Sequence, residues 1–292
     1  MIPSPELPQD KVGLRQNERP GGRTFRRPPF HLSDIWKAPL NDFPIRDEIL
    51  YQYLPLSKNM DVLEIGPGSG LTAFRLARQV RSLTLMDVAA KSVARLSKRL
   101  QSLANVSCVC ADPGGSPFAP ELKREFDVVF GLDVFEYVVD PAACLQNVAQ
   151  MLRPSGELFL TFPNVSPPAG DGVTYFTNLT QLTDMLRRAE FRQWAIFAVR
   201  LRPLAELVYS VAHQFPLRVY RRLRRGNPNG RPHTYEETWS FRQLESCERF
   251  RMPLHVLWYL LGHAMRLRGD IFAAEVAVNR ILGRQLVIHA VK

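Results

Sequence analysis

The sequence predicts an α/β fold in which a doubly wound, mostly parallel sheet is interrupted by a helical insert before its last strand. From residue 61 onward, short apolar runs alternate with segments whose apolar residues recur at helical spacing. The apolar runs are continuous rather than alternating, which is typical of strands buried on both faces of a parallel sheet. Glycines follow the first run, where sheets of this kind turn into a helix. The 292 residues exceed a common domain of ~100–150 residues, so appendages are expected beside one full core.

Five apolar runs are expected to form parallel strands, and the segments between them are expected to form covering helices. The expected strands are residues 61–65, 82–86, 106–110, 126–130 and 158–162. The expected helices are residues 71–80, 91–103, 141–152 and 180–188. A shorter amphipathic helix should precede them and end at Pro55. Its apolar residues at helical spacing are Ile45, Ile49, Leu50 and Tyr53.

Four segments are expected along the chain. They are a flexible lead (1–30), the sheet domain (31–200), a basic helical insert (201–280) and the last strand of the sheet (281–292). The lead holds six prolines and has no apolar period, which is typical of a segment without fixed structure. Two more strands are expected at 194–199 and 285–291. The ~85 residues between these strands are too many for a hairpin loop, so the insert must carry structure of its own.

The net charge of +10 is concentrated near the ends of the chain. Residues 41–200 hold 16 Lys and Arg against 17 Asp and Glu, whereas residues 201–292 hold 15 against 7. A basic surface attracts the phosphates of anionic lipid or of RNA, and either partner would meet the insert. The alternatives for the insert are a solvated arginine-rich face, an ordinary helical cap and a dimer interface.

The sequence favours a cytoplasmic protein. If the basic insert binds anionic lipid, the protein would also contact the inner face of the membrane peripherally. The amino terminus lacks the apolar segment of a signal peptide, and no run of ~18 apolar residues predicts a membrane span. The four cysteines are too few and too irregularly spaced for a disulfide framework, and they lack the spacing of a zinc site. No metal is therefore expected.

The glycine turn Gly66-Pro67-Gly68-Ser69-Gly70 closes the first strand and opens the first helix. A dinucleotide-binding turn would need Gly or Ala at Leu71, and a phosphate-binding loop would need a lysine there. Carboxylates stand at this edge instead, Glu64 just before the turn and Asp87 and Asp112 after the next two strands. An acid at the second strand suits ribose hydroxyls, and one at the third suits an exocyclic amine. Three acids around one pocket repel a pyrophosphate and favour a nucleoside ligand that carries positive charge.

These motifs resemble the class I S-adenosylmethionine-dependent methyltransferases, in particular the small-molecule branch that includes ubiquinone biosynthesis. The resemblance covers residues 45–200 and the last strand, and it implies a seven-stranded sheet and S-adenosylmethionine as the cofactor. The segment 126–137 is similar to the family block that ends in Leu-Glu-His, with Tyr137 in place of the histidine. The implied cofactor-binding residues are Glu64, Gly66, Pro67, Gly68, Gly70, Asp87, Val88, Asp112 and Asp133. Phe118 is expected beside the adenine.

The implied reaction is in-line methyl transfer to an oxygen or nitrogen of a small or lipid-associated acceptor. A hydroxyl or ammonium acceptor must lose a proton to a nearby base. Glu136 and Asp133 are the catalytic candidates at the end of the fourth strand, and the histidines considered beside them are His213, His233 and His263. The alternative for Glu136 is a helix cap or a solvated carboxylate. The alternative functions are an RNA methyltransferase that uses the insert, and a non-catalytic scaffold of the same fold.

Overall fold

The structure is a computed structural model of the chain, and most of its central domain is described. The described residues are 50, 53–54, 56–68, 70–115, 122, 125–163, 179–201, 207, 211, 271–274 and 285–292. The expected lead and nearly all of the expected insert lie outside these residues. Of the short amphipathic helix expected before Pro55, Leu50 and Leu54 are described, and both are almost fully buried.

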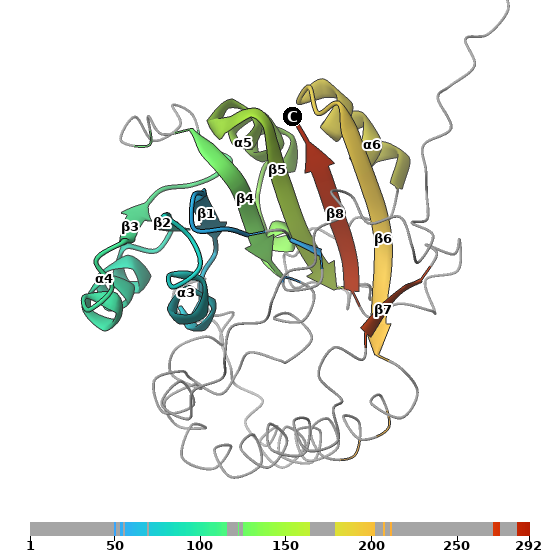
Figure 1. Ribbon diagram of the computed structural model, residues 1–292. Coiled ribbons are helices and arrows are strands. Elements are labelled where there is room, and N and C mark those ends of the chain that lie inside the picture. The colour runs from blue at the N-terminus through green and yellow to red at the C-terminus, as the bar shows by residue number, and fades with distance from the viewer. Residues whose placement is uncertain are drawn as a thin grey trace, which may run out of the picture.

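One twisted sheet forms the centre of the molecule (Figure 1). Its strands run in the order β3-β2-β1-β4-β5-β8-β6-β7. Those from β3 to β5 pair in parallel, and those from β5 to β7 pair antiparallel. The strands are β1 (Asp61–Ile65), β2 (Ser82–Asp87), β3 (Val106–Cys110), β4 (Phe126–Leu132), β5 (Leu152–Pro163), β6 (Gln193–Leu201), β7 (Ile271–Ala274) and β8 (Gln285–Val291). The predicted doubly wound α/β fold is confirmed, and all seven expected strands are present.

The eighth strand, β7, was not expected from the sequence. It pairs antiparallel with the end of β6, and it lies inside the segment 201–280 that the sequence predicts as a helical insert. Its run Ile-Phe-Ala-Ala directly follows Gly269-Asp270. A strand of four residues has too little periodicity to be told from the apolar helix pattern that precedes it, which is why the sequence analysis missed it.

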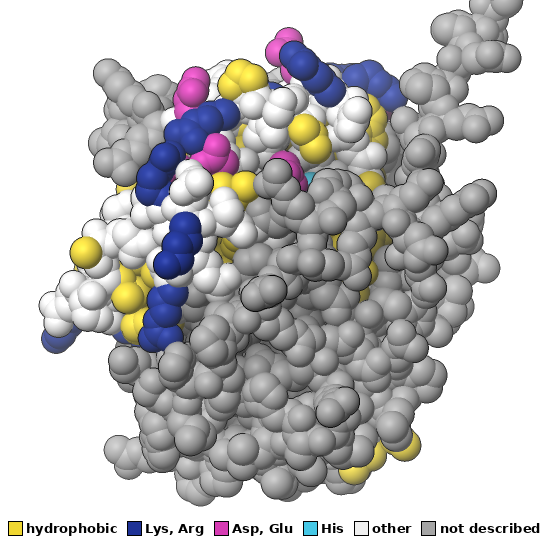
Figure 2. All heavy atoms as spheres, in the orientation of Figure 1, with side chains coloured by type: hydrophobic (Ala, Val, Ile, Leu, Met, Phe, Trp, Pro, Cys, Tyr) yellow, Lys and Arg dark blue, Asp and Glu magenta, His cyan; other side chains and the backbone are white. Residues whose placement is uncertain are grey.

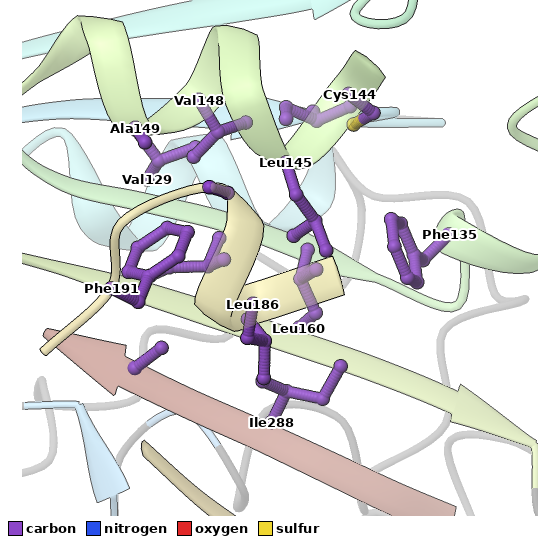
Figure 3. Close-up of a cluster of buried hydrophobic side chains, with 14 of the residues drawn as sticks. Val129, Phe135, Cys144, Leu145, Val148, Ala149, Leu160, Leu186, Phe191 and Ile288 are labelled. Atoms are coloured by element: carbon purple, nitrogen blue, oxygen red, sulfur yellow. The ribbon is translucent and has the colours of Figure 1, made fainter. Parts of the chain in front are cut away.

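Helices cover both faces of the sheet (Figure 1). One apolar cluster joins α3 (Leu71–Leu76) and α4 (Ala90–Leu100) to strand residues such as Val62 and Phe130. A second cluster joins α5 (Pro141–Met151) and α6 (Leu179–Arg188) to the opposite face, where Leu63 and Val129 lie. Figure 3 shows this second cluster, in which Leu145 and Val148 of α5 and Leu186 of α6 pack towards the strands. Successive residues of a buried strand alternate between the two clusters, as the continuous apolar runs predict.

The transition from α5 into β5 has no intervening loop. Asp140 begins the helix, because its carboxylate accepts a hydrogen bond from the Ala143 amide at 2.9 Å and Pro141 occupies the first turn. The helix ends at Met151, and Leu152 already belongs to the strand. The strand therefore begins six residues earlier than the expected 158. Ser155, with a φ of 66°, lies in this early part of the strand, whose pairing with β4 is irregular.

Ion pairs tie the strands together at the edge of the sheet opposite the glycine turn. Arg153 donates to Asp127 at 2.6 Å and to Asp61 at 2.8 Å, and Asp61 also pairs with Arg81. The hydrogen bond from Arg81, together with those from Ser82 and Arg153, holds the pKa of Asp61 well below its usual range against the opposing effect of burial. Figure 2 shows acidic and basic side chains lying side by side on the described part of the face in view, as the balanced charge of residues 41–200 predicts.

Candidate active site

The glycine turn after β1 has a left-handed backbone conformation that glycine adopts readily and other residues adopt rarely. Gly66, Gly68 and Gly70 have φ angles of 64°, 53° and 74°. A β-carbon on Gly66 would lie 2.3 Å from Cγ2 of Val134, and one on Gly70 would lie 2.7 Å from Cδ2 of Leu96. Among the described residues, a β-carbon on Gly68 would have no atom within 4 Å. Gly66 and Gly70 are therefore required by packing, whereas no described residue fills the space at Gly68, where a ligand can enter.

Glu64 lies beneath this turn, near the carboxyl end of β1. Its side chain is only 3% exposed, and its neighbours in the sheet are Leu85 of β2 and Phe130 of β4. The carboxylate shares with Val62 the face of the sheet that α3 and α4 cover. Glu64 is thus a buried acid that lies next to the glycine turn on the same strand.

Asp87 ends β2 on the neighbouring strand. Its Oδ1 atom accepts a hydrogen bond from the Ala89 amide at 2.9 Å. Burial raises the pKa of the Asp87 carboxyl, and the Ala89 amide offsets part of that rise. Val88, the next residue, keeps 45% of its side chain exposed at the edge of the sheet. The Asp87 carboxylate can accept hydrogen bonds from ribose hydroxyls, and the exposed Val88 can pack against a planar base attached to that ribose.

Asp112 follows β3 and is exposed at the start of a tight turn. Its Oδ1 accepts from the Gly114 amide at 2.9 Å, and its carbonyl accepts from the Gly115 amide at 3.1 Å. The turn also contacts α5, where Asn147 donates to the carbonyls of Pro113 and Gly115. The expected adenine contact Phe118 lies outside the described residues.

Asp133 follows β4 with a φ of 50°, which is rare for a residue other than glycine. Its amide donates to the carbonyl and to Oγ1 of Thr161 on β5, at 3.0 and 3.1 Å. The hydroxyl of Thr161 donates in turn to Oδ1 of Asp133 at 3.2 Å. Thr161 is fully buried, so this polar pair fixes Asp133 in its left-handed conformation at the mouth of the site.

Glu136 lies in the short 3-10 helix η2 (Phe135–Tyr137) and is 4% exposed. From the sequence, the alternative to a base at Glu136 was a helix cap or a solvated carboxylate. The structure places Glu136 in neither position, because Asp140 caps α5 and Glu136 is buried. Of the residues that follow it, Tyr137 is 51% and Val139 94% exposed, whereas Val138 is buried.

The predicted cofactor residues therefore gather at the carboxyl ends of β1 to β4, four neighbouring strands. His213, His233 and His263 lie outside the described residues. Within the described part of the chain, no group of three or more His, Cys, Asp and Glu side chains is placed to hold a metal ion. No helix in that part is long and apolar enough to cross a membrane.

Three residues that shape the site were missed in the sequence analysis. Thr161 interrupts the apolar run 158–162, and Asn147 is a weak helix former inside a helix. A polar residue at such a position indicates a specific hydrogen bond, so both could have been found from the sequence. Val134 gave no such signal. Its role depends on its close approach to Gly66, which is 68 residues away in sequence and which only the folded chain brings near.

The chain is similar in sequence to known methyltransferases. Residues 63–160 match the methyltransferase domain family. A ubiquinone biosynthesis O-methyltransferase of Xanthomonas euvesicatoria is 30% identical over 161 residues, which cover 52% of this chain and 66% of that protein. The protein of the same description from Pseudomonas aeruginosa is 34% identical over 110 residues, which cover 37% of this chain and 46% of that protein. The chain thus aligns with less than two thirds of the length of these relatives.

The fold is also similar to that of a solved methyltransferase. The phosphoethanolamine N-methyltransferase 2 of Haemonchus contortus, solved in complex with S-adenosyl-L-methionine, superposes with a TM-score of 0.52 at 15% identity. The superposition covers 88% of this chain and 56% of that one. Strand order, glycine turn and domain match agree, and residues 63–160 accordingly form a methyltransferase domain with the class I fold.

Proposed function

We propose that this chain binds S-adenosylmethionine and transfers its methyl group to an oxygen or nitrogen of a small or lipid-associated acceptor. The observation that carries the proposal is the open space above Gly68, which is bordered by a strand end carrying Asp87 and a turn carrying Asp112. A cationic donor fits such a site because carboxylates attract its ammonium and sulfonium groups. The donor itself supplies an activated methyl group, so the reaction needs no metal.

Each acid has a distinct role in holding the donor. Asp87 accepts hydrogen bonds from the ribose hydroxyls, and Val88 packs against the adenine. Asp112 accepts from the exocyclic amine of the adenine. Gly66, Pro67, Gly68 and Gly70 bring the backbone close to the methionine portion, with Glu64 and Asp133 contributing negative charge to that end. The chain thereby orients the methyl group towards the acceptor, and orientation is the main source of rate in a displacement of this kind.

Proton removal from the acceptor is assigned to Glu136 or Asp133, the two acids at the end of β4. Asp133 is held in place by Thr161, and Glu136 is screened from bulk water. A carboxylate in fixed geometry next to the acceptor can take the proton as the methyl group moves. The relatives that are described as ubiquinone biosynthesis O-methyltransferases support an oxygen as the methylated atom.

An apolar acceptor is favoured by exposed apolar side chains of the described residues. Tyr137 at the end of η2 and Val139 two residues later present apolar surface to solvent. Leu207 and Val211 lie four residues apart at the start of the expected insert and are 60% and 62% exposed. An exposed apolar face followed by the arginine run 218–225 suits peripheral contact with an anionic membrane, where a lipid-associated acceptor would be found.

The test is incubation of the purified chain with S-adenosylmethionine that carries a labelled methyl group, together with a cell extract. The extract is then separated into lipids, water-soluble small molecules, nucleic acid and protein. Label in the lipid or small-molecule fraction is the expected result. Label confined to RNA would replace the proposed acceptor with the nucleic acid. Calorimetric binding of the donor without labelling of any fraction would indicate a scaffold, and absence of binding would overturn the proposal.

A further inference from the structure

The turn after β3 is tied to α5 by the side chain of Asn147. The Nδ2 atom of Asn147 donates to the carbonyl of Pro113 at 2.9 Å and to the carbonyl of Gly115 at 3.1 Å. These two carbonyls flank Gly114, whose amide donates to the carboxylate of Asp112. Asn147 therefore lies one step away from the acid to which the proposed function assigns the adenine, without reaching the ligand space itself.

The helix that carries Asn147 is itself firmly anchored. Cys144, Leu145 and Val148 of α5 are buried against the sheet, as Figure 3 shows. The first turn of the helix is fixed by the Asp140 cap. The backbone of Asn147 is therefore held in place, so its side chain can fix the position of the neighbouring turn.

The turn packs closely against the start of α5. A β-carbon on Gly114 would lie 3.1 Å from the carbonyl oxygen of Asp140, which caps that helix. Within the turn, the carboxylate and the carbonyl of Asp112 accept from the Gly114 and Gly115 amides, but the two glycines offer no side chain that could anchor the turn to α5. The amide of Asn147 supplies that fixation, because its single nitrogen carries two hydrogens and can satisfy both carbonyls.

We infer that Asn147 is a positioning residue for adenine recognition, an inference that rests on the proposed function. It orients the Pro113–Gly115 turn, and through it the carboxylate of Asp112, towards the exocyclic amine of the donor. Asn147 on a separate helix adds a constraint from outside the turn to the hydrogen bonds within it.

The experiment compares the binding of two ligands by calorimetry. The first is S-adenosylhomocysteine, and the second is its hypoxanthine analogue, in which an oxygen replaces the exocyclic amine. The wild-type chain should bind the adenine compound about tenfold more tightly, because the analogue leaves the Asp112 carboxylate without its donor. In Asn147→Leu, affinity for the adenine compound should fall about tenfold while affinity for the analogue stays nearly constant, so that the preference disappears.

The matched control is Gln146→Leu, which changes an exposed amide on the same helix. It should keep both affinities and the preference for adenine. Asn147→Ala serves as a second variant if the leucine side chain prevents folding, and thermal unfolding of each variant confirms a folded protein. An unchanged preference in a folded Asn147 variant would overturn the inference. A wild-type chain that binds neither compound would instead overturn the proposed function.

Discussion

Cγ2 of Val134 occupies the space that a β-carbon on Gly66 would need, at only 2.3 Å from its ideal position. Cγ1 of the same valine lies 2.7 Å from the corresponding position on Gly131. The turns that follow β1 and β4 are thus fitted to each other around one side chain. Because both turns border the ligand space, this contact determines how far apart the methionine end of the donor and the acids of β4 can be.

Gly66→Ala and Gly68→Ala should separate folding from ligand binding. Both variants place alanine in a left-handed conformation, which costs about 1–2 kcal/mol of unfolding free energy. Gly66→Ala should lose about 1–3 kcal/mol more through the clash with Val134. Gly68→Ala meets no atom of the described residues, so its methyl group should mainly obstruct the donor. Urea unfolding and calorimetry on both variants measure the two effects.

Val134→Ala is the control for this pair. In the Gly66→Ala background it should restore part of the lost stability, whereas in the Gly68→Ala background it should restore none. Equal stability losses in the two glycine variants, with no rescue by Val134→Ala, would show that the two turns are not fitted in this way.

Asp87→Ala should weaken donor binding by about 1.5–3 kcal/mol through the loss of charge-assisted hydrogen bonds. The pH dependence of binding gives an independent readout. Because burial raises the pKa of Asp87, the carboxylate takes up its proton at a higher pH than an ordinary aspartate does. Donor affinity should therefore be full above that pKa and fall below it. In Asp87→Asn this fall in donor affinity at low pH should vanish. If it persists, the titrating group is not Asp87.

Thr161→Val should lower donor affinity by up to about tenfold, because the variant releases the carboxylate of Asp133 and weakens the hold on its amide. It should also lower the unfolding free energy by about 1–2 kcal/mol. Thr84→Val is the matched control, since Thr84 is also a buried strand threonine with one hydroxyl contact, 3.2 Å from Oγ of Ser107. The control should lose similar stability and keep its donor affinity. Equal affinities in both variants would count against a role for Thr161 in the site.

Asp61→Asn should reduce stability in a pH-dependent way. The hydrogen bond from Arg81 lowers the folded-state pKa of Asp61, so its contribution is complete above the unfolded value of about 4 and is lost as the pH falls towards the folded value. The loss at neutral pH should be on the order of 1 kcal/mol, because solvent screens the exposed partner Arg81. The difference from wild type should shrink between about pH 4 and pH 2 in urea unfolding. Asp184→Asn, in an exposed pair on α6, should show no such trend.

The fold was predictable because its signals are local. The apolar runs that became β1 to β5 are continuous, and the glycines and acids at their ends are close to them in sequence, so order and spacing were enough to place Asp87 and Asp112. The contacts that adjust the site were not predictable in the same way. Thr161 meets Asp133, and Asn147 meets Pro113, across 28 and 34 residues of sequence. Such pairings depend on the register of strands and the rotation of a helix, which composition and periodicity do not specify.

The direct passage from α5 into β5 places Asn147 and Thr161 on one uninterrupted piece of chain. In the proposed binding mode, Asn147 supports the turn at the nucleobase end of the donor and Thr161 supports Asp133 at the methionine end. The helix-to-strand junction at Met151 then fixes the distance between these two supporting residues. An extra residue inserted there would rotate the helix by about 100° against the strand. Asn147 would then turn away from the Pro113–Gly115 turn while β5 kept its register. This junction should therefore tolerate insertions less well than the surface turns do.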